Sequence, residues 1–573
     1  MNDDSQQPTV AGSGWIGYER FVPALLLGPL LRHVDRETAT IWVEVDQSCR
    51  VKILQVEETT FEVSGHHYAL VCIGGLVEGT STEYTVELDG EQVWPLPGST
   101  HPPSRIRTLQ PDRPQRIAFG SCRVATQNSA AERRRFGIDA LDAYAVRTAR
   151  HPDDGWPDLL LMLGDQVYAD GTTPQTQTRI AARRDLKQPP GTQVADFEEY
   201  TWLYQESWSD PEIRWLMSTV PIAMIFDDHD VHDDWNTSRA WRRQMQKTDW
   251  WSERITGALM SYWVYQHLGN LSPEELAADA VYAKVRAAAD AEADAAPILQ
   301  AFAEAADRET GDGKGYRWSF WRDLGSTRLV VIDSRCGRML DRDDRAMLSD
   351  AEFDWIDGRL TGDYDHLLIG TSLPWLLAPS LHALEAWDEK LSASKRPRVR
   401  RFGEKLRQGA DLEHWAAFGA SFDRLARILA DVGSGRRTAV APATICVLSG
   451  DVHHSYVSEA DLSVLAARSG PAPMTSRVYQ VTCSPVHNWV PGALKVMLAA
   501  FWSAPIGGGL TRLLTRFGRI PRPSVSWRTI DGPFFGNAIS TLVLERRAAR
   551  LVMESTRRST RKRSLETVVA RDL

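Results

Sequence analysis

Paired cysteines, targeting signals and a basic surface are all missing from this sequence. The six cysteines among its 573 residues form no Cys-x-x-Cys pair, which excludes a disulfide scaffold and a zinc ribbon. Residues 1–7 are acidic and polar and lack the positive region and apolar core of a secretory signal, so we expect a cytoplasmic protein. The 66 Lys+Arg and 75 Asp+Glu leave a net charge of -9, which argues against nucleic acid as the main partner.

Long hydrophobic runs and two common catalytic motifs are absent as well. The longest uncharged apolar stretch, residues 496–511, is too short for a membrane span and contains Pro505. No G-x-S-x-G or Walker A motif occurs, which argues against acyl hydrolases and nucleoside triphosphatases. What is present, 43% hydrophobic and 25% charged residues, is the composition of an ordinary globular protein.

The N-terminal part of the chain has the pattern of a small β-sandwich. Residues 40–45 and 84–88 alternate between polar and apolar side chains, and Asp89-Gly90 is a hairpin-turn signal. Short strands at this spacing predict two packed antiparallel sheets. We place an immunoglobulin- or fibronectin-like domain at residues 20–112, ending in a proline-rich linker.

The sequence pattern changes after residue 113, where short apolar runs each end in a polar cluster. These runs lie at 116–122, 159–165, 222–229, 329–333, 367–370 and 445–451. Such runs predict strands buried on both faces of an α/β or α+β domain, whose ligand sites lie at the carboxyl ends of the strands. We place this domain at residues 113–555. Its further features are helical insertions at about 244–311 and 381–432, a hairpin of residues 539–545 and 550–554, and then a basic tail at 556–573.

Four polar clusters follow these runs directly. They are Gly120-Ser121-Cys122-Arg123, Gly164-Asp165-Gln166-Val167-Tyr168-Ala169-Asp170, Asp227-Asp228-His229-Asp230-Val231-His232-Asp233-Asp234 and Gly450-Asp451-Val452-His453-His454-Ser455. Carboxylates and imidazoles are costly to bury alone, so a convergent set at strand ends indicates a bound cation. Asp165, at the centre of the most compact motif, is the natural candidate to bridge two ions.

The residue types of these clusters constrain the metals. A thiol and a phenol beside carboxylates favour a strongly Lewis-acidic ion such as iron(III), whereas the remaining carboxylates suit calcium, manganese or zinc. We therefore expect two or more metal ions, iron(III) together with one of those divalent ions. Two ions about 3.5–4 Å apart can activate a water molecule and hold a phosphoryl group.

In this order the four clusters resemble the signature motifs of the alkaline phosphatase D (PhoD-like) family of calcineurin-type metallophosphoesterases. Ile332-Asp333-Ser334-Arg335 is also similar to that family's Asp-Thr-Arg element, and the likeness covers about residues 116–554. The resemblance implies an N-terminal β-sandwich followed by a calcineurin-like metallophosphoesterase domain. That domain would be an α+β or α/β unit with two central sheets flanked by helices and with helical insertions.

The resemblance also implies roles for individual residues. An iron-like ion would be held by Cys122, Asp165 and Tyr168, and a second metal or metals by Asp165, Asp228, Asp233 and Asp451, with His453 as a further ligand. His229 falls where this superfamily places the proton donor to the leaving group. Arg335 and Arg123 are candidates to contact phosphate oxygens, because the guanidinium group has a fixed donor geometry.

Several positions depart from the family pattern or leave two interpretations open. Asp230 stands where Glu is expected, and Asp233-Asp234 where Asn-Asn is frequent. Asp227 and Asp170 are either ligands or orienting carboxylates, and His232 and His454 are neighbours of the ligands or surface groups. Ordinary buried thiols are expected at Cys49, Cys72, Cys336, Cys446 and Cys483.

Two longer segments also have alternative interpretations. Eight of the 21 tryptophans lie between Trp202 and Trp263, either packing helices or forming an aromatic wall over the metal site. Residues 494–520 combine apolar side chains with Lys495 and three arginines. This segment is either a lid or an amphipathic helix on an anionic membrane, which would make the protein membrane-peripheral.

The leading functional hypothesis is a metal-dependent hydrolase of phosphoric esters, either a phosphomonoesterase or a phosphodiesterase. A metal-bound hydroxide would attack phosphorus and His229 would protonate the leaving group. The substrate would be a small phosphate ester or a phospholipid, and the sequence does not specify an oligomeric state. The alternatives are a non-catalytic metal-stabilised binding module and a phosphodiesterase acting on phospholipids at a membrane surface.

Overall fold

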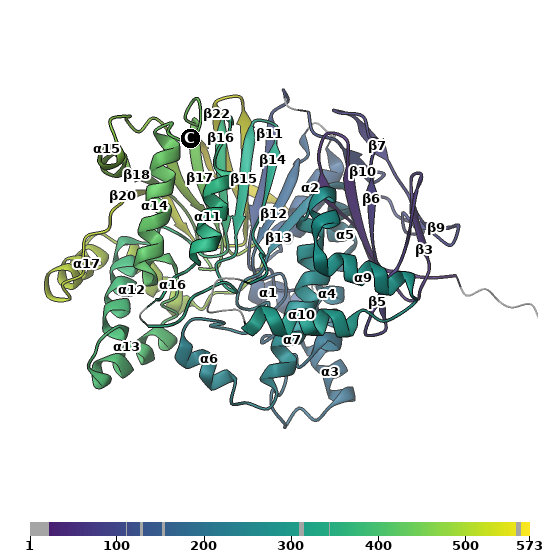
Figure 1. Ribbon diagram of the computed structural model, residues 1–573, viewed down its shortest axis with the longest axis horizontal. Coiled ribbons are helices and arrows are strands. Elements are labelled where there is room, and N and C mark those ends of the chain that lie inside the picture. Colours follow the sequence, from purple (N-terminus) through teal and green to yellow (C-terminus); the bar gives the residue numbers. More distant parts are fainter. Residues whose placement is uncertain are drawn as a thin grey trace, which may run out of the picture.

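The computed structural model describes residues 22–110, 112–126, 130–151, 155–308, 315–342, 344–556 and 563–573. Residues 20–21 and 309–311, which we assigned to the predicted sandwich and the first insertion, lie outside this part. Figure 1 shows two large central sheets with helices on their outer faces and a strand-rich N-terminal unit at one side. The predicted α+β architecture with two central sheets is confirmed.

The N-terminal unit contains strands β1 to β10. Their bounds are β1 Leu25–Val34, β2 Ala39–Val45, β3 Arg50–Ile53, β4 Val56–Thr59, β5 Phe61–Val63, β6 His66–Ile73, β7 Ser81–Glu83, β8 Val86–Leu88, β9 Glu91–Trp94 and β10 Arg105–Arg107. Two four-stranded sheets, β1-β2-β6-β5 and β4-β3-β8-β9, enclose one apolar core that includes Ile41, Val51 and Val71. On β2 and β6 alternate residues point into this core, among them Ile41, Val43, Ala69 and Val71, as the alternating pattern of residues 40–45 predicted.

The first central sheet has the order β13-β12-β11-β21-β22-β23. Its strands are β11 Gln115–Gly120, β12 Leu159–Leu163, β13 Ile222–Ile225, β21 Ala538–Glu545, β22 Ala548–Thr556 and β23 Leu565–Asp572. β11, β12 and β13 are parallel, and β21 and β22 form the predicted hairpin. Of the basic tail that we expected at residues 556–573, residues 557–562 lie outside the described part. The remainder contains β23, which pairs antiparallel with β22 and buries the apolar Val569 and Leu573 against the sheet.

The second central sheet has the order β14-β15-β16-β17-β19-β18-β20. Its strands are β14 Phe320–Leu324, β15 Thr327–Ile332, β16 His366–Thr371, β17 Thr444–Ser449, β18 Ser455–Asp461, β19 Arg477–Thr482 and β20 Ser526–Phe534. β15, β16, β17 and β19 are parallel. The parallel strands lie at the centre of the second sheet and at one end of the first, where β13 is the edge strand, and the carboxyl ends of both sets can converge on one site.

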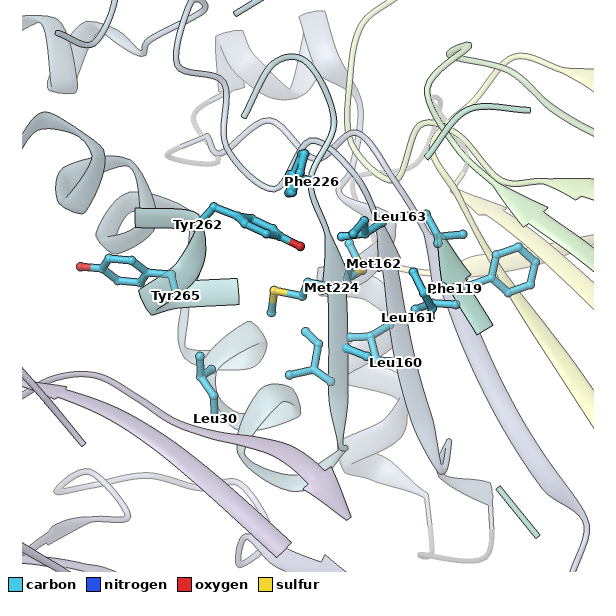
Figure 2. Packing of buried hydrophobic residues seen from close by; sticks show 14 of the residues in the cluster. Leu30, Phe119, Leu160, Leu161, Met162, Leu163, Met224, Phe226, Tyr262 and Tyr265 are labelled. Atoms are coloured by element: carbon cyan, nitrogen blue, oxygen red, sulfur yellow. The ribbon is translucent and has the colours of Figure 1, made fainter. Parts of the chain in front are cut away.

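The two central sheets pack face to face. A side chain at Gly370 of β16 would come within 3.2 Å of Leu163 of β12, so the small residue permits close sheet contact. Figure 2 shows the opposite face of the first sheet, where Met224 of β13 faces Tyr262 and Tyr265 of the π-helix Tyr262–His267. The strands of this sheet are therefore buried on both faces, which explains their unbroken apolar runs.

Helices cover the outer faces of the sheets. Their bounds are α1 Ala130–Phe136, α2 Ala140–Arg150, α3 Pro174–Arg183, α4 Phe197–Trp208, α5 Pro211–Thr219, α6 Arg239–Met245, α7 Trp251–Ser261, α8 Pro273–Ala278, α9 Ala280–Asp290, α10 Ala296–Arg308, α11 Asp350–Arg359, α12 Pro379–Ser392, α13 Pro397–Gly409, α14 Gly419–Gly433, α15 Ser463–Ser469, α16 Gly492–Trp502 and α17 Ile506–Phe517. α11 and α14 pack on the second sheet (Figure 1). α7 to α10 and α12 to α14 lie in the two regions where we expected helical insertions.

Length and composition make one helix pair of the described chain a candidate for membrane crossing. No single helix in the described ranges is long and apolar enough to span a bilayer. α16 and α17 meet the length and composition criteria only together, and their axes are bent by 64° at the break between them.

A buried arginine connects the N-terminal unit to the central sheets. Arg32 of β1 is fully buried and donates hydrogen bonds to the carbonyl oxygens of Ile222 (3.1 Å), Tyr265 (2.8 Å) and Gln266 (2.5 Å). Burial lowers the pKa of Arg32 to about 9. These bonds compensate the buried guanidinium and hold the N-terminal unit against β13, one of the strands that carry the candidate site.

Candidate metal centre

The four predicted clusters converge at the carboxyl ends of β11, β12, β13 and β17. Several of their residues adopt left-handed backbone conformations, with φ of 59° at Cys122, 53° at Asp165, 66° at Asp451 and 51° at His453. Non-glycine residues rarely adopt this conformation, which costs energy and persists where surrounding structure enforces it. The strained turns aim side chains from separate strands at one point.

Two glycines allow these turns to approach one another. A Cβ atom on Gly164 would lie 2.6 Å from Cβ of Asp227, and a Cβ atom on Gly450 would lie 2.1 Å from Oγ of Ser121. Any larger residue at either position would push the strand ends apart. The Gly-Asp pairs predicted from the sequence therefore serve close packing as well as ligand placement.

A first group of ligand-type atoms comes from Cys122, Asp165 and His453, and these atoms lie within 4.8 Å of one another. Tyr168 joins this group because its hydroxyl donates to Oδ2 of Asp165 at 3.3 Å. Asn488, which the sequence reasoning missed, donates to the same hydroxyl at 2.8 Å and lies 3.3 Å from Nε2 of His453. The structure thus places His453 beside Cys122, whereas the resemblance implied the second metal for it.

A second group contains Asp227, Asp228 and Asp451, again with oxygen atoms within 4.8 Å. Asp165 and Asp228 also form a group with His229, so Asp165 lies between the two sets. The sequence left Asp227 as either a ligand or an orienting carboxylate. In the structure one of its oxygen atoms lies within 4.8 Å of an oxygen of Asp228 and an oxygen of Asp451. Asp233 falls instead in a group with Asp170 and His229, and its side chain is 62% exposed.

The two arginines expected to contact phosphate oxygens have other partners. Arg335 is 0% exposed and forms ion pairs with Asp227, Asp228 (3.0 Å), Glu413 (2.6 Å) and Asp451 (3.6 Å). Its guanidinium group therefore braces the carboxylates from behind.

Arg123 also points away from the cluster. It is buried, pairs with Asp139 at 2.8 Å and donates to the carbonyl oxygen of Ser207 at 2.7 Å. Both guanidinium groups are thus buried and already paired with carboxylate or carbonyl oxygens, which argues against direct contact with a phosphate.

Buried oxygen atoms without partners indicate whether cations fit this cluster. Oδ1 of Asp165 and Oδ2 of Asp227 are buried without a hydrogen-bond partner in the described structure. Burial raises the pKa of Asp165, and the neighbouring Asp228 raises it further. Burial likewise raises the pKa of the Cys122 thiol, with a further contribution from Asp165. Cations among these oxygens and the sulfur would supply the missing compensation, so the residues fit multiple metal ions.

His453 is also in the state that a metal ligand requires. Burial, and secondarily the charge of His229, lower the pKa of His453 to about 4, so its imidazole stays neutral, which is the form that binds a metal. By contrast, His454 is saturated: Nδ1 donates to the carbonyl oxygen of Val452 at 2.6 Å, and Nε2 accepts from Trp502 at 2.9 Å. His454 is thus a neighbour of the ligands.

Asp230 acts as a brace for the loops that carry the ligands. Its carboxylate accepts backbone N–H bonds from Asp165 (2.9 Å), Gln166 (3.1 Å), Val167 (3.3 Å) and Asp227 (2.9 Å). A carboxylate with this many donors fixes the relative position of two strand ends. Asp230, which stands where Glu was expected, therefore has a structural role, and its short side chain holds the two loops together.

His229 lies at the rim of the cluster and is oriented by Asp170. Nδ1 of His229 donates to the Asp170 carboxylate at 2.9 Å, and its ring lies 4.7 Å from the ring of Tyr168. Burial alone would lower the pKa of His229, but the charges of Asp170 and Asp228 raise it well above its ordinary value. The arrangement favours an imidazolium that can release a proton from Nε2.

His414 is a further member of the site that sequence reasoning missed. Its Nε2 lies 2.9 Å from Oδ2 of Asp451 and its Nδ1 lies 2.6 Å from Oε1 of Glu385. Both nitrogens face carboxylates, and the neighbouring Glu413 pairs with Arg335. His414 sits in the second helical region, where no strand-end pattern marks it, so only the fold could reveal its position.

The tryptophan-rich region is mainly a packing element. Trp241, Trp250 and Trp251 surround His232 with ring centroids 5.8, 6.0 and 6.2 Å away. Trp208 packs edge-on against Trp42 of the N-terminal unit. These contacts favour the interpretation that the tryptophans pack helices, and they place His232 outside the metal groups.

The two facing central sheets bring buried carboxylates, imidazoles, a thiol and a phenol to one edge. This arrangement is the framework of a metal-dependent phosphoric ester hydrolase. A family model described as PhoD-like phosphatase matches residues 136–495. The chain therefore belongs to the PhoD-like phosphatase family, and the resemblance seen in its motifs is confirmed. It is a metal-dependent phosphoesterase whose donor groups support several metal ions.

The other comparisons concern the fold and the N-terminal unit. The solved structure of PhoD is 12% identical, with a TM-score of 0.54 over 95% of this chain and 92% of that chain, so the two share a fold. Purple acid phosphatase PPD1 from yellow lupin (Lupinus luteus) seeds is 9% identical, with a TM-score of 0.47 over 96% and 74% of the chains. A model for a domain of unknown function, DUF7800, matches residues 22–106. No curated protein matches the chain.

Proposed function

We propose that this phosphatase hydrolyses small phosphoric mono- or diesters at a centre that combines iron(III) with calcium, manganese or zinc. Cys122, Asp165, Tyr168 and His453 would hold the iron, because a thiolate and a phenolate favour a trivalent ion. Asp165, Asp228 and Asp451 would hold the divalent ion, with Asp227 as a further oxygen donor. When bound, the ions would polarise the phosphoryl oxygens and activate a water molecule.

Asp165 occupies the position between the two sets of donors. Its Oδ2 accepts from Tyr168, whereas its Oδ1 is buried without a partner and is available to a cation. This unpaired oxygen in the midst of other carboxylates is the observation that carries the proposal. Without cations, Arg335 would be the countercharge of Asp227 and Asp228, and His229 that of Asp165 and Asp228, so the carboxylates would outnumber the positive charges beside them.

His229 is the proposed proton donor to the departing alkoxide. Asp170 holds Nδ1 of its ring, which leaves Nε2 directed away from that carboxylate. A proton on Nε2 would pass to the leaving-group oxygen, and Asp170 would keep the ring oriented while this happens. Arg335 acts as a positioning residue that fixes the carboxylates.

Two alternatives are less well supported. A non-catalytic binding module would be expected to have lost ligands or the acid, yet the described chain retains Cys122, Asp165, Asp228, His229 and Asp451 in one cluster. A phospholipid substrate has no independent support at the metal centre itself. Membrane contact rests on a different part of the molecule and is argued below.

The proposal can be tested with chromogenic esters and metal removal. Purified protein would be assayed on p-nitrophenyl phosphate and bis(p-nitrophenyl) phosphate before and after dialysis against a chelator, with elemental analysis of each sample. We expect activity and bound iron to fall together and to return when iron and a divalent ion are added. Full activity in metal-free protein would contradict the proposed centre, and the ratio of the two rates would distinguish monoesterase from diesterase.

A further inference from the structure

The helix pair α16–α17 exposes an unusual amount of apolar surface. Of the thirteen large hydrophobic residues that are exposed in the described chain, six lie between residues 489 and 517: Trp489, Val496, Met497, Ile506, Leu513 and Phe517. α16 is predominantly apolar, and none of its residues is buried. Contiguous exposed apolar surface of this kind marks an interaction site.

The segment of the chain that contains this hairpin carries charge of one sign. From Leu462 to Ile530 the chain contains no Asp or Glu, although Asp and Glu number 75 in the whole chain. The same stretch contains one lysine and seven arginines, among them Arg512, Arg516 and Arg519 near the apolar face. A basic apolar surface on a protein of net charge -9 is complementary to an anionic partner.

The hairpin is anchored to the body of the protein on its inner face. Leu514 and the half-buried Leu510 of α17 pack with Ala383 and Trp387 of α12. Leu513 and Phe517 of the same helix remain exposed, so α17 has a packed face and a free face. Figure 1 shows α17 at the edge of the molecule, outside α12. The exposed face therefore belongs to a positioned element of the fold.

Both ends of α16 adjoin the metal centre. Asn488, just before the helix, contacts Tyr168 and His453, and Trp502 at its end donates to His454 at 2.9 Å. A surface that docks on α16 would therefore lie beside the metal centre. This placement connects the hairpin to the same region of the molecule that carries the chemistry.

We propose that the α16–α17 hairpin docks the protein on an anionic phospholipid surface, lying in the interface without spanning the bilayer. Apolar side chains would enter the acyl boundary while the flanking arginines meet lipid phosphates. Spanning is disfavoured because α17 is packed against α12 and the two helices are bent by 64°. A second copy of the chain is a poorer occupant, since its identical basic hairpin would bring like charges together.

The test is sedimentation with vesicles of phosphatidylcholine mixed with phosphatidylglycerol, compared with vesicles of phosphatidylcholine alone. We expect the full chain to bind the anionic vesicles and to be released by salt. Phe517→Ser should weaken binding roughly tenfold, because it removes a largely exposed aromatic anchor. Arg512→Gln with Arg516→Gln should weaken it roughly thirtyfold, because both charges act near the headgroups.

A matched control separates docking from general effects of the substitutions. Phe402 on α13 is 56% exposed, against 72% for Phe517, and lies outside the hairpin. Phe402→Ser should leave vesicle binding unchanged. Circular dichroism would confirm that all variants are folded, and activity on p-nitrophenyl phosphate in the absence of vesicles would be followed separately.

Three outcomes would overturn the proposal. The chain could stay in the supernatant with both kinds of vesicle, or bind both equally with no effect of the hairpin variants. Light scattering could instead show a dimer that Phe517→Ser dissociates, with no vesicle binding, which would identify a second copy as the occupant. Because docking is measured without turnover, its failure is distinct from failure of the proposed reaction.

Discussion

Asp170 accepts a hydrogen bond from Nδ1 of His229 at 2.9 Å, and the same carboxylate accepts the backbone N–H of Asp233 at 2.7 Å. Burial alone would raise the pKa of Asp170, but the charge of His229 and its hydrogen bond lower that pKa below its ordinary value. The carboxylate is therefore ionised and fixed on two sides. It fixes the tautomer and the direction of the imidazole at the rim of the metal centre.

The first prediction concerns proton donation by His229. His229→Asn should slow hydrolysis of an alkyl phosphate about a hundredfold or more, because the alkoxide then departs unprotonated. p-Nitrophenyl phosphate should be affected far less, since its leaving group needs little protonation. Measured kcat/KM values for both esters would show the contrast, and Asp170→Asn should produce a weaker effect in the same direction.

A control for this comparison is Asp249→Asn, which changes an exposed carboxylate outside the site. It should leave the ratio of the two rates unchanged. Equal losses on both esters in His229→Asn would contradict the acid role and would indicate that His229 supports the ligands alone.

The second prediction concerns Asp165. Asp165→Asn should remove most of the bound metal and at least about a hundredfold of the activity, because both ligand sets lose a shared carboxylate. Elemental analysis and turnover would be measured on the same samples. Asp290→Asn, an exposed carboxylate on α9, is the matched control. Wild-type metal content in Asp165→Asn would show that the centre lies elsewhere.

The third prediction concerns the His414–Asp451 contact. His414→Gln should weaken metal binding about 10- to 100-fold, because the imidazole positions an oxygen ligand and its loss leaves Asp451 free to rotate. Competition with a chelator of known affinity would measure this change. Glu385→Gln should act in the same direction, since Glu385 holds the other ring nitrogen.

His382→Gln provides the control for losing a buried histidine in this region. His382 lies on the same helix as Glu385, and packs against Phe422 and Trp527. Its replacement should lower stability but leave metal affinity unchanged. If His382→Gln and His414→Gln reduced metal affinity equally, the effect would come from the fold of α12 and not from the contact with Asp451.

The fourth prediction concerns pH and the His66 pair. His66 of β6 lies 2.7 Å from Glu198 of α4 and 3.3 Å from the buried Glu44, and so links the N-terminal unit to the central domain. Burial opposes protonation, but the two carboxylates raise the pKa of His66 to about 9. Because the folded pKa lies above the unfolded value, this contribution is complete below about pH 6.5 and is lost as pH rises through about 9.

The size of this contribution is limited by its partners. The hydrogen bond from His66 lowers the pKa of Glu198, whereas burial raises the pKa of Glu44. The cost of desolvation therefore offsets part of the stability that the ion pairs contribute. We expect about 1–2 kcal/mol between pH 6.5 and 9. Thermal unfolding at a series of pH values should show it in the wild type and not in His66→Gln. Parallel curves for the two proteins would contradict the assignment.

The strand ends that carry the ligands could be predicted because their signals are local. An apolar run followed directly by a polar cluster, with Gly-Asp at 164–165 and 450–451, indicates a buried strand and a tight turn within a few residues. This is why Cys122, Asp165, Asp228 and Asp451 were expected near one another and are found in neighbouring groups. The roles assigned to them remain predictions.

Other features depend on partners that are distant in the sequence. Arg335 follows a strand, as a phosphate-binding arginine would, yet Asp227 and Glu413 enclose it. His414 and Asn488 carry no motif, and β23 becomes a strand only because β22 offers it an edge. Their positions follow from packing between segments that are far apart in the sequence, which local sequence patterns cannot predict.

The sequence by itself therefore determined the architecture, the family and the chemical types gathered at the site, because hydrophobic periodicity, turn residues and motif order are properties of short segments. Only the tertiary structure decided which carboxylates lie together in each group, that both ring nitrogens of His414 face carboxylates, and that α16 is left uncovered. Those relationships are set by burial and by charge compensation across the two sheets, which arise only when the strands are assembled.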